Sequence, residues 1–441
     1  MRRVLTVCIL MAATLGMAGE ALAQTTRRAF EGAVGFGTDT KAGQAGKVVR
    51  VRTLAGKGPG SLREALALAE PRIVVFEVGG VIDLDGEDLV ISEPMVLVAG
   101  QTAPGPGITI IKGSLRIAAS DVVLRHLRVR PGDMGKPKKS GFSPDGIAIG
   151  NASGKPGVRR VVVDHCSATW AVDENLTASG PRHEGREGTS GEVTFSNCII
   201  AEGLSQATHE KGEHSMGSLI HDHVRNVSII GNLYAHNMNR NPVLKPDASA
   251  VVVNNLIYNP GAKAMHSYWN MNEWRDRPDK PVPPTLVAVN NVFWHGPNTP
   301  ANLALIFMQA DKGEVFSEGN MVRTREGGAG TVVAGKPVIL KEKPLWPAGL
   351  EATATDKVAE AVLSKAGAWP RDEIDARIVA SARDGKGKVI DSQEEVGGYP
   401  KHKEVRRPLD VPADDGKLDQ HGRTRIAAWL DELARQVMTA K

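Results

Sequence analysis

Aromatic residues and cysteines are scarce in this 441-residue sequence, with 4% Phe, Trp and Tyr together and only three Cys. So few cysteines exclude a scaffold held together by many disulfides. Beyond the N-terminus, no run stays apolar for the roughly 20 residues that a membrane-spanning helix needs. In contrast, 48 Gly favour a fold with many tight turns, and 26 Pro argue against long uninterrupted helices.

The N-terminus has the three-part pattern of a secretory signal peptide. Arg2 and Arg3 form a basic start, residues 4–17 form an apolar core, and residues 21–23 fit the A-x-A cleavage motif. The apolar core is too short to span a membrane, and an ordinary buried helix would not need this pattern. We therefore expect residues 1–23 to be removed and the mature protein to be secreted or periplasmic.

The charge balance says little about partners. Loss of Arg2, Arg3 and Glu20 with the signal changes the net charge from +4 to +3. This mild excess is no evidence for nucleic-acid binding, and it permits a polyanionic substrate without requiring one. We expect a monomer with no nucleic-acid or membrane partner.

Short β-rich runs separated by turn residues dominate the chain after residue 46. The first exception is a short helix, because Ser61 and Glu64 fit the capping box S-x-x-E and Leu62, Ala65 and Leu66 lie on one apolar face. Strand-like runs then follow at residues 73–78, 95–98, 108–111, 115–117 and 122–129.

In each run, apolar and polar residues alternate up to one final residue. When the runs are aligned on that residue, it recurs at intervals of 39, 32, 35, 23 and 36 residues. An apolar residue lies two positions before each aligned residue, and another lies one position after it. This pattern suits a solenoid, in which each coil buries its inward side chains on the next coil. The aligned column contains His126, His165, Asn197, Asn232, Asn255 and Asn291.

Strand-like runs without intervening helices predict an all-β protein, a right-handed parallel β-helix with a short N-terminal capping helix. Residues of one column would stack about 4.8 Å apart, with asparagine amides bonded from coil to coil. A β-sandwich has similar short strands, but it would not keep asparagines in register through four coils.

The same column makes Cys166 and Cys198 neighbours on successive coils. Export favours a disulfide between them, whereas the apolar residues beside them favour two buried thiols. Both possibilities stay open at this point.

The repeat fades near Arg325, which predicts a β-helix domain at residues 24–325 and a partly helical C-terminal tail at residues 326–441. We expect the tail to pack along the β-helix and to cover its open end, since an unprotected sheet edge invites aggregation. A small separate domain is the alternative. Helical patterns in the tail occur at residues 356–366, 372–383 and 424–438.

Two acidic residues and one arginine follow the column at nearly equal distances, and two more acids join the group: Asp145, in the turn before the His165 coil, and Glu174, next to Asp173. Equal offsets from a stacked column imply one side of the solenoid, so we expect these side chains to be close together. Carboxylates on loops favour Ca²⁺ over Zn²⁺, which prefers His and Cys; ordinary solvated acids at strand ends are the alternative. The group comprises Asp173 and Arg240 eight residues after the column, Asp133 seven residues after it, and also Asp145 and Glu174.

The segment HEKGEH at residues 209–214 is not the zinc motif H-E-x-x-H, and no helix is predicted there, so we do not expect zinc. Lys211 could contact an anionic substrate, or it could be an ordinary exposed lysine. Downstream, Tyr268, Trp269 and Trp274 lie in one long loop, where aromatic rings either stack on sugars or pin the loop.

Several stretches together resemble the pectate lyases, a family of right-handed β-helix polysaccharide lyases, over residues 30–245 and more weakly to residue 398. The resemblance implies calcium-dependent β-elimination on polygalacturonate, an acidic polysaccharide. The matching stretches are AFEGAVGFG, GKGPGSLREAL, RIVVFEVGGVI, VAGQTAPGPGITI, VVLRHLRVRPGD, VVVDHCSATWAVDENL and the RNP of residues 240–242.

The resemblance also implies roles for the cationic residues. The family's R-x-P-x-x-R signature falls on RNPVLK, so Arg240 takes the place of the catalytic base and Lys245 replaces the second arginine. This replacement keeps the charge but loses the planar fork that binds a carboxylate through two hydrogen bonds. We expect Lys245, Lys211 and His209 to bind substrate.

Of the family's calcium carboxylates, Asp145 and Asp173 match positions in this chain. A third acid is expected four residues after Asp173, where this chain has Thr177, and Glu174 is the candidate replacement.

Two other functions compete with the lyase hypothesis. A glycoside hydrolase on the same fold would use paired acids, and the chain has enough of them. A non-catalytic carbohydrate-binding β-helix is the second rival, for which the departures at Lys245 and Thr177 argue. Elimination leaves an unsaturated, ultraviolet-absorbing sugar end, whereas hydrolysis leaves none.

Overall fold

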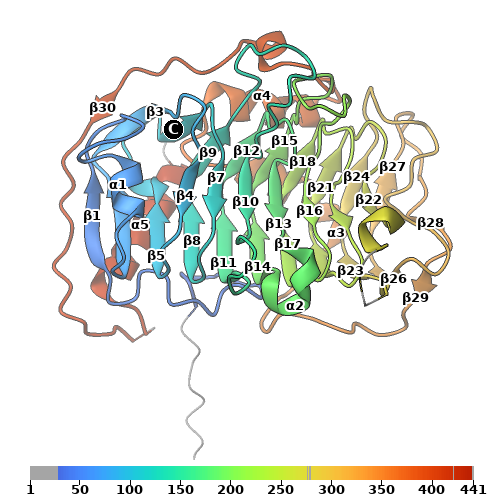
Figure 1. Ribbon diagram of the computed structural model, residues 1–441, viewed down its shortest axis with the longest axis horizontal. Coiled ribbons are helices and arrows are strands. Elements are labelled where there is room, and N and C mark those ends of the chain that lie inside the picture. Colours follow the sequence, from blue (N-terminus) through green and yellow to red (C-terminus); the bar gives the residue numbers. More distant parts are fainter. Residues whose placement is uncertain (1–27, 276, 278–279, 421, 440–441) are drawn as a thin grey trace, which may run out of the picture.

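The computed structural model describes residues 28–275, 277, 280–420 and 422–439. The predicted signal peptide lies outside these residues. Within them, the strands form three parallel sheets, and each coil of the chain adds one strand to each sheet in turn (Figure 1). This arrangement confirms the predicted parallel β-helix. No helix in the described ranges combines the length and the apolar character needed to cross a membrane.

Sheet 1 contains β1 (Lys47–Val51), β2 (Arg72–Phe76), β5 (Val96–Ala99), β8 (Val122–Arg125), β11 (Arg159–Asp164), β14 (Gly191–Ser196), β17 (Arg225–Ile230), β20 (Ser249–Val253), β23 (Thr285–Val289), β26 (Glu314–Glu318) and β29 (Val338–Ile339). Sheet 2 contains β3 (Val78–Asp83), β6 (Ile108–Ile111), β9 (Leu127–Arg130), β12 (Ser167–Thr169), β15 (Ile199–Ala201), β18 (Leu233–Ala235), β21 (Leu256–Tyr258), β24 (Val292–Trp294) and β27 (Met321–Arg323), with β30 (Val405–Arg406) antiparallel to β3.

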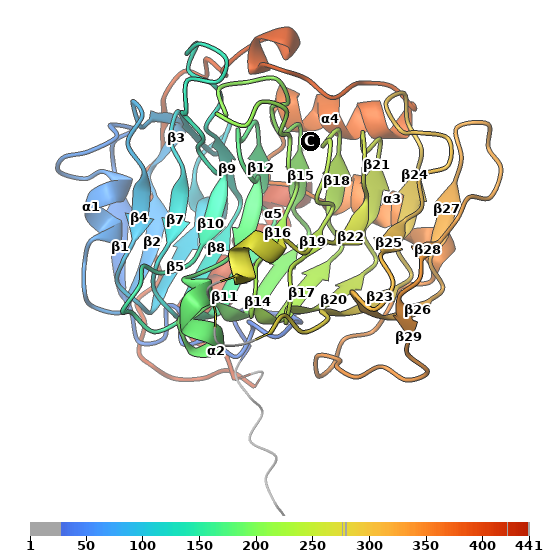
Figure 2. The ribbon, with the colours of Figure 1, turned by 45° about the vertical axis from the view of Figure 1, so that its right-hand side comes forward.

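Sheet 3 contains β4 (Leu89–Ile91), β7 (Leu115–Ile117), β10 (Ile147–Ile149), β13 (Leu176–Ala178), β16 (Leu219–Ile220), β19 (Val243–Leu244), β22 (Met265–Ser267), β25 (Ile306–Met308) and β28 (Val333–Gly335). Figure 2 shows its strands side by side along the solenoid. Alternation explains the core: in β10, both isoleucines are buried while Ala148 between them is partly exposed.

The N-terminal capping helix is α1 (Leu62–Leu66). The Ser61 hydroxyl accepts a hydrogen bond from the Glu64 amide at 3.2 Å, and the Glu64 carboxylate accepts one from the Gly60 amide at 2.7 Å. Leu62 and Leu66 are buried in the main core, so α1 covers the first coil. The remaining helical segments are α2 (Gly185–Gly188), α3 (Thr355–Lys365), α4 (Glu373–Arg383), α5 (Arg425–Thr439), η1 (Gly100–Thr102), η2 (Arg182–Glu184), η3 (Met271–Trp274) and η4 (Gln393–Val396).

The predicted column is correct from His126 to Asn197 and again from Asn232 to Asn291, but the two parts are out of register by one residue. Ser196 pairs with Ile230 and Ile199 with Leu233, so Cys198, not Asn197, stacks on Asn232. Asparagine is favoured at both adjacent positions. At the first it adopts the left-handed backbone of the turn (φ 52° at Asn197), and at the second its amide joins the buried ladder. The amino-acid sequence alone therefore could not fix the register. The ladder itself runs through Asn232, Asn255, Asn291 and Asn320, each amide donating to the next side chain at 2.9 Å.

Both stacked cysteines are free and buried. The Cys166 thiol donates to the Leu124 carbonyl at 3.8 Å, and the Cys198 thiol donates to the Val163 carbonyl at 3.4 Å. Of the two possibilities left open by the sequence, the structure therefore has the buried thiols.

The C-terminal chain runs back along the solenoid to its N-terminal end, where β30 pairs with β3 (Figure 1). Helices α3 and α4 pack on the outer face of sheet 2, and α5 packs on the outer face of sheet 1. Strand pairing continues to Ile339, past the residue at which the sequence repeat fades, and Ile339 itself is 60% exposed. The apolar outer faces of the sheets are long, so helices lying along them bury more surface than a cap on the last coil. The expectation that the tail covers an open end therefore holds for the N-terminal edge of sheet 2, where β30 pairs with β3, and not for Ile339 in the last coil.

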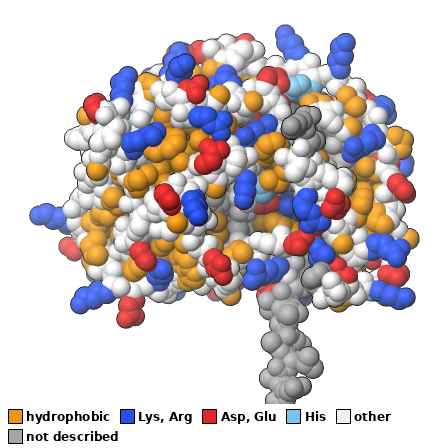
Figure 3. Space-filling view, turned by 180° about the vertical axis from the view of Figure 1, so that it is seen from behind, with side chains coloured by type: hydrophobic (Ala, Val, Ile, Leu, Met, Phe, Trp, Pro, Cys, Tyr) orange, Lys and Arg blue, Asp and Glu red, His pale blue; other side chains and the backbone are white. Residues whose placement is uncertain are grey.

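On the face opposite to that of Figure 1, basic and acidic side chains are interspersed rather than gathered by sign (Figure 3). Such a surface has no single-sign patch that would attract a polyanion by long-range electrostatics.

Candidate active site

The site residues lie at one edge of sheet 3, in the connections that lead into it from sheet 2. Asp145 precedes β10, Asp173 and Glu174 precede β13, and Arg240 precedes β19. Because these connections occupy equivalent places in nearby coils, the solenoid brings the four side chains together, as the equal offsets predicted for Asp173 and Arg240. A cavity of about 530 Å³ adjoins Asp145 on the outer face of sheet 3.

Three carboxylates form the centre of the site. Oxygens of Asp145, Asp173 and Glu174 lie within 4.8 Å of one another, and Asp145 also accepts a hydrogen bond from the Glu174 amide at 3.0 Å. Burial and then the charge of Asp173 raise the pKa of Asp145 to about 8. Carboxylates that repel each other in this way fit a hard, oxygen-preferring cation, so these three residues could hold Ca²⁺.

Arg240 lies against this cluster and forms an ion pair with Glu174. Its backbone has left-handed geometry (φ 59°), which turns the chain just before β19. Burial lowers the pKa of Arg240, and the negative charges of Asp173 and Asp145 oppose that effect. A partly buried guanidinium with a lowered pKa is closer to acting as a base than a fully exposed one.

Two sequence positions do not join the cluster. Thr177 is 3% exposed, and its hydroxyl donates to the Leu219 carbonyl at 2.9 Å. Asp133, which the offset placed with the other acids, instead accepts a hydrogen bond from the Gln393 side chain at 2.8 Å. The offset failed for Asp133 because a tail residue far away in the sequence holds it.

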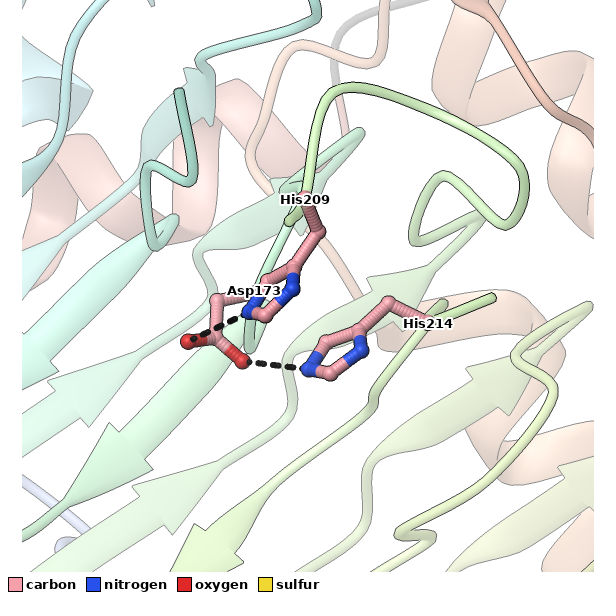
Figure 4. A group of neighbouring side chains, drawn as sticks. All are labelled: Asp173, His209 and His214. Carbon is pink, nitrogen blue, oxygen red and sulfur yellow. Dashed lines mark hydrogen bonds and ion pairs between the residues drawn. The ribbon is translucent and has the colours of Figure 1, made fainter. Parts of the chain in front are cut away.

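Asp173 is held by two histidines, His209 and His214, whose rings stack with centroids 3.7 Å apart (Figure 4). His214 Nε2 lies 3.0 Å from one oxygen of Asp173, and His209 Nε2 lies 3.7 Å from the other. Burial alone would raise the pKa of Asp173, but the hydrogen bond and charge of His214 hold it below its usual value. His214 was missed by sequence reasoning, although the spacing of the two histidines in one loop was a visible signal.

These three residues lie close enough together to hold a metal ion. The Lys211 amide, however, donates to His209 Nδ1 at 3.1 Å. The neutral His209 ring then carries its proton on Nε2, which faces Asp173 as a donor rather than as a metal ligand. The hydrogen bonding therefore favours a role for His209 in orienting Asp173.

The two predicted substrate-binding lysines differ in environment. The Lys211 side chain is exposed in the loop that carries the histidines. Lys245 is 4% exposed and forms an ion pair of 2.8 Å with Glu273. Among the loop aromatics, Trp274 is buried and donates to Asp222 at 3.1 Å, while Tyr268 is 46% exposed.

Comparisons with known proteins give one consistent result. A probable pectate lyase C of Neosartorya fischeri is 30% identical to this chain in an alignment that covers 95% of this chain and 97% of the relative. The probable pectate lyase C of Aspergillus oryzae is 31% identical over 92% of this chain and 94% of its own length. No family model matches the sequence.

Two solved structures share the fold at low sequence identity. Jun a 1, the major allergen from cedar pollen, superposes with a TM-score of 0.53 at 15% identity, over 76% of this chain and 92% of the allergen. A Bacillus sp. N165 pectate lyase in complex with trigalacturonate gives 0.51 at 12% identity, over 76% and 98%. From the sequence relatives, with the fold in agreement, it follows that this chain belongs to the pectate lyase family.

Proposed function

We propose that the protein is an exported lyase that cleaves polygalacturonate or a related uronan by calcium-assisted β-elimination. The observation that carries this proposal is a partly buried Arg240 beside three clustered carboxylates, of which Asp145 lines a cavity. Family membership and the trigalacturonate complex of a structural relative support the substrate class. The signal-like pattern of residues 1–23 supports export.

Asp145, Asp173 and Glu174 would hold the calcium ion. Bound there, calcium would neutralise the substrate carboxylate, so that the carbanion formed on loss of the neighbouring C5 proton is stabilised. Arg240 in its neutral form removes the C5 proton, the electron pair forms the C4–C5 double bond, and the C4–O bond breaks, so that the C4 oxygen leaves with the bonding electrons and takes a proton from water. Lys211 and His209 lie on the loop beside Asp173, where Lys211 is placed to meet a substrate carboxylate.

Arginine can act as a base only if its pKa is lowered, because the guanidinium normally stays protonated. Burial supplies part of this lowering. In addition, Glu174 both pairs with Arg240 and belongs to the carboxylate cluster. A cation that draws on the charge of Glu174 leaves the protonated guanidinium with less compensation, which lowers its pKa further.

The test is ultraviolet absorbance of an unsaturated product from polygalacturonate, with calcium or with a chelator, at neutral and alkaline pH. We expect product only with calcium in the wild type, and none from a folded Arg240→Ala variant. New reducing ends without absorbance would identify a hydrolase. Binding without any cleavage would identify the non-catalytic alternative.

A further inference from the structure

Two cationic side chains converge on one carboxylate oxygen near the candidate site. Lys245 Nζ lies 2.8 Å from Glu273 Oε2, and Arg182 Nη1 lies 2.9 Å from the same oxygen. The other oxygen of Glu273 accepts a hydrogen bond from the Asn270 side chain at 3.1 Å. Lys245 follows β19, while Arg182 lies in η2 and Glu273 in η3, so the contact joins separate coils.

This cluster belongs to the same flank as the candidate base. Burial lowers the pKa of Arg240, and the charge of Glu273 is among those that oppose the lowering, so the two groups are within electrostatic reach. The Lys245 side chain is 5% exposed, whereas that of Glu273 is 25% exposed. A ligand that approaches from solvent therefore meets Glu273 and Arg182, whose side chain is 34% exposed, before it meets Lys245.

Convergent Lys and Arg side chains are a usual way to bind the carboxylate of a uronate. Here the chain's own carboxylate already occupies that position. The charges of Lys245 and Arg182 also act on Asp222, which is fully buried. Lys245 and Arg182 are thus already paired with Glu273, so a free substrate carboxylate gains little attraction here and is repelled by Glu273. A methyl-esterified uronate does not meet this repulsion.

We propose that Glu273 is a specificity-determining residue that makes the position beside Lys245 prefer a uronate with an esterified carboxyl over one with a free carboxylate. This rests on the proposed function, because it assigns a substrate preference to the same site. Partially methyl-esterified polygalacturonate, rather than the fully free acid, is then the preferred polymer.

The experiment compares binding of trigalacturonate and of its methyl ester, by calorimetry, in the Arg240→Ala background, where turnover is removed. We expect the ester to bind more tightly before further change. Glu273→Gln should shift the ratio of the two affinities toward the free acid by about fivefold, the size of a partly exposed charge interaction. Glu187→Gln, which removes an exposed carboxylate on α2, is the matched control and should leave the ratio unchanged.

A double variant, Lys245→Met with Glu273→Gln, guards against misfolding caused by an unpaired buried lysine. It should fold and should lose most of the gain in free-acid binding. The proposal is overturned if Glu273→Gln changes both affinities by the same factor, shifts the ratio toward the ester, or leaves both ligands unbound. Failure of the proposed lyase function would be seen separately, as a wild type that makes no unsaturated product. The ratio of the affinities for the free acid and the ester can still be measured in that case.

Discussion

Calcium affinity should depend steeply on pH, because Asp145 must lose a proton before it can bind a cation. Its pKa is raised from an ordinary 3.8 to about 8 by burial and by Asp173, so the metal-free site is protonated at neutral pH. A cation displaces this proton, and the apparent affinity then falls about tenfold for each pH unit below 8. Between pH 9 and pH 6 the loss is about 100-fold, or about 2.7 kcal/mol of binding free energy.

Isothermal titration calorimetry with CaCl₂ measures this directly. Repeating each titration in two buffers of different ionisation enthalpy gives the number of protons released. We expect about one proton per ion at pH 6 and almost none at pH 9, since Asp145 is already ionised at the higher pH. The same raised pKa makes the metal-free fold less stable as pH rises from about 4 toward 8, because the folded state holds a proton that the unfolded chain releases.

Two variants make the test specific to Asp145. Asp145→Asn should bind calcium more weakly at pH 9 and should lose both the pH dependence and the proton release. Asp88→Asn removes a more exposed neighbouring carboxylate and should keep the steep pH dependence, with a slightly lower midpoint, since the charge of Asp88 contributes to the raised pKa of Asp145. A wild-type affinity that is constant from pH 6 to 9, or an equal slope in Asp145→Asn, would refute the reasoning.

Three further predictions concern the base, the ladder and the tail. Arg240→Lys should lower the rate of unsaturated-product formation by more than about 100-fold with little change in thermal stability, since general-base catalysis contributes at least that factor; a rate near that of the wild type would exclude Arg240 as the base. Asn255→Ala should lower the free energy of unfolding in urea by about 3 kcal/mol, because the buried Asn232 amide loses its acceptor at 2.9 Å, and exposed Asn272→Ala should have almost no effect. Arg130→Met should destabilise the fold by about 3 to 5 kcal/mol and expose α4 to proteolysis, because buried Asp372 and Asp375 lose one of the two arginines that they share and keep only Arg128, at 3.5 Å and 3.3 Å. Surface Arg383→Met on the same helix is the control, and equal effects of the two variants would contradict a role for the buried charges.

The sequence predicted most of the scaffold because its periodicity follows directly from the fold. Each coil must bury apolar side chains on its neighbours, so the repeat of aliphatic and asparagine positions is visible without coordinates. The one-residue slip between Asn197 and Asn232 shows the limit of that argument. Both adjacent positions accept asparagine, and only the paired strands decide which residue is in the ladder.

The same limit applies to the site. The equal offset of Asp173 and Arg240 correctly predicted their shared edge, and Asp145 and Glu174 join them because they lie in equivalent connections of the solenoid. The offset misplaced Asp133, since its partner Gln393 comes from the tail.

By itself, then, the sequence determined the β-helix, its capping helix and the set of acids and one arginine that meet at the edge of sheet 3, since these depend on a local repeat. Only the tertiary structure decided which charges compensate one another. Two such contacts join segments from different coils: the ion pair of Lys245 with Glu273, and the contacts of Asp173 with His209 and His214. No periodic pattern encodes such contacts, because they depend on how loops of unequal length fold over the same edge.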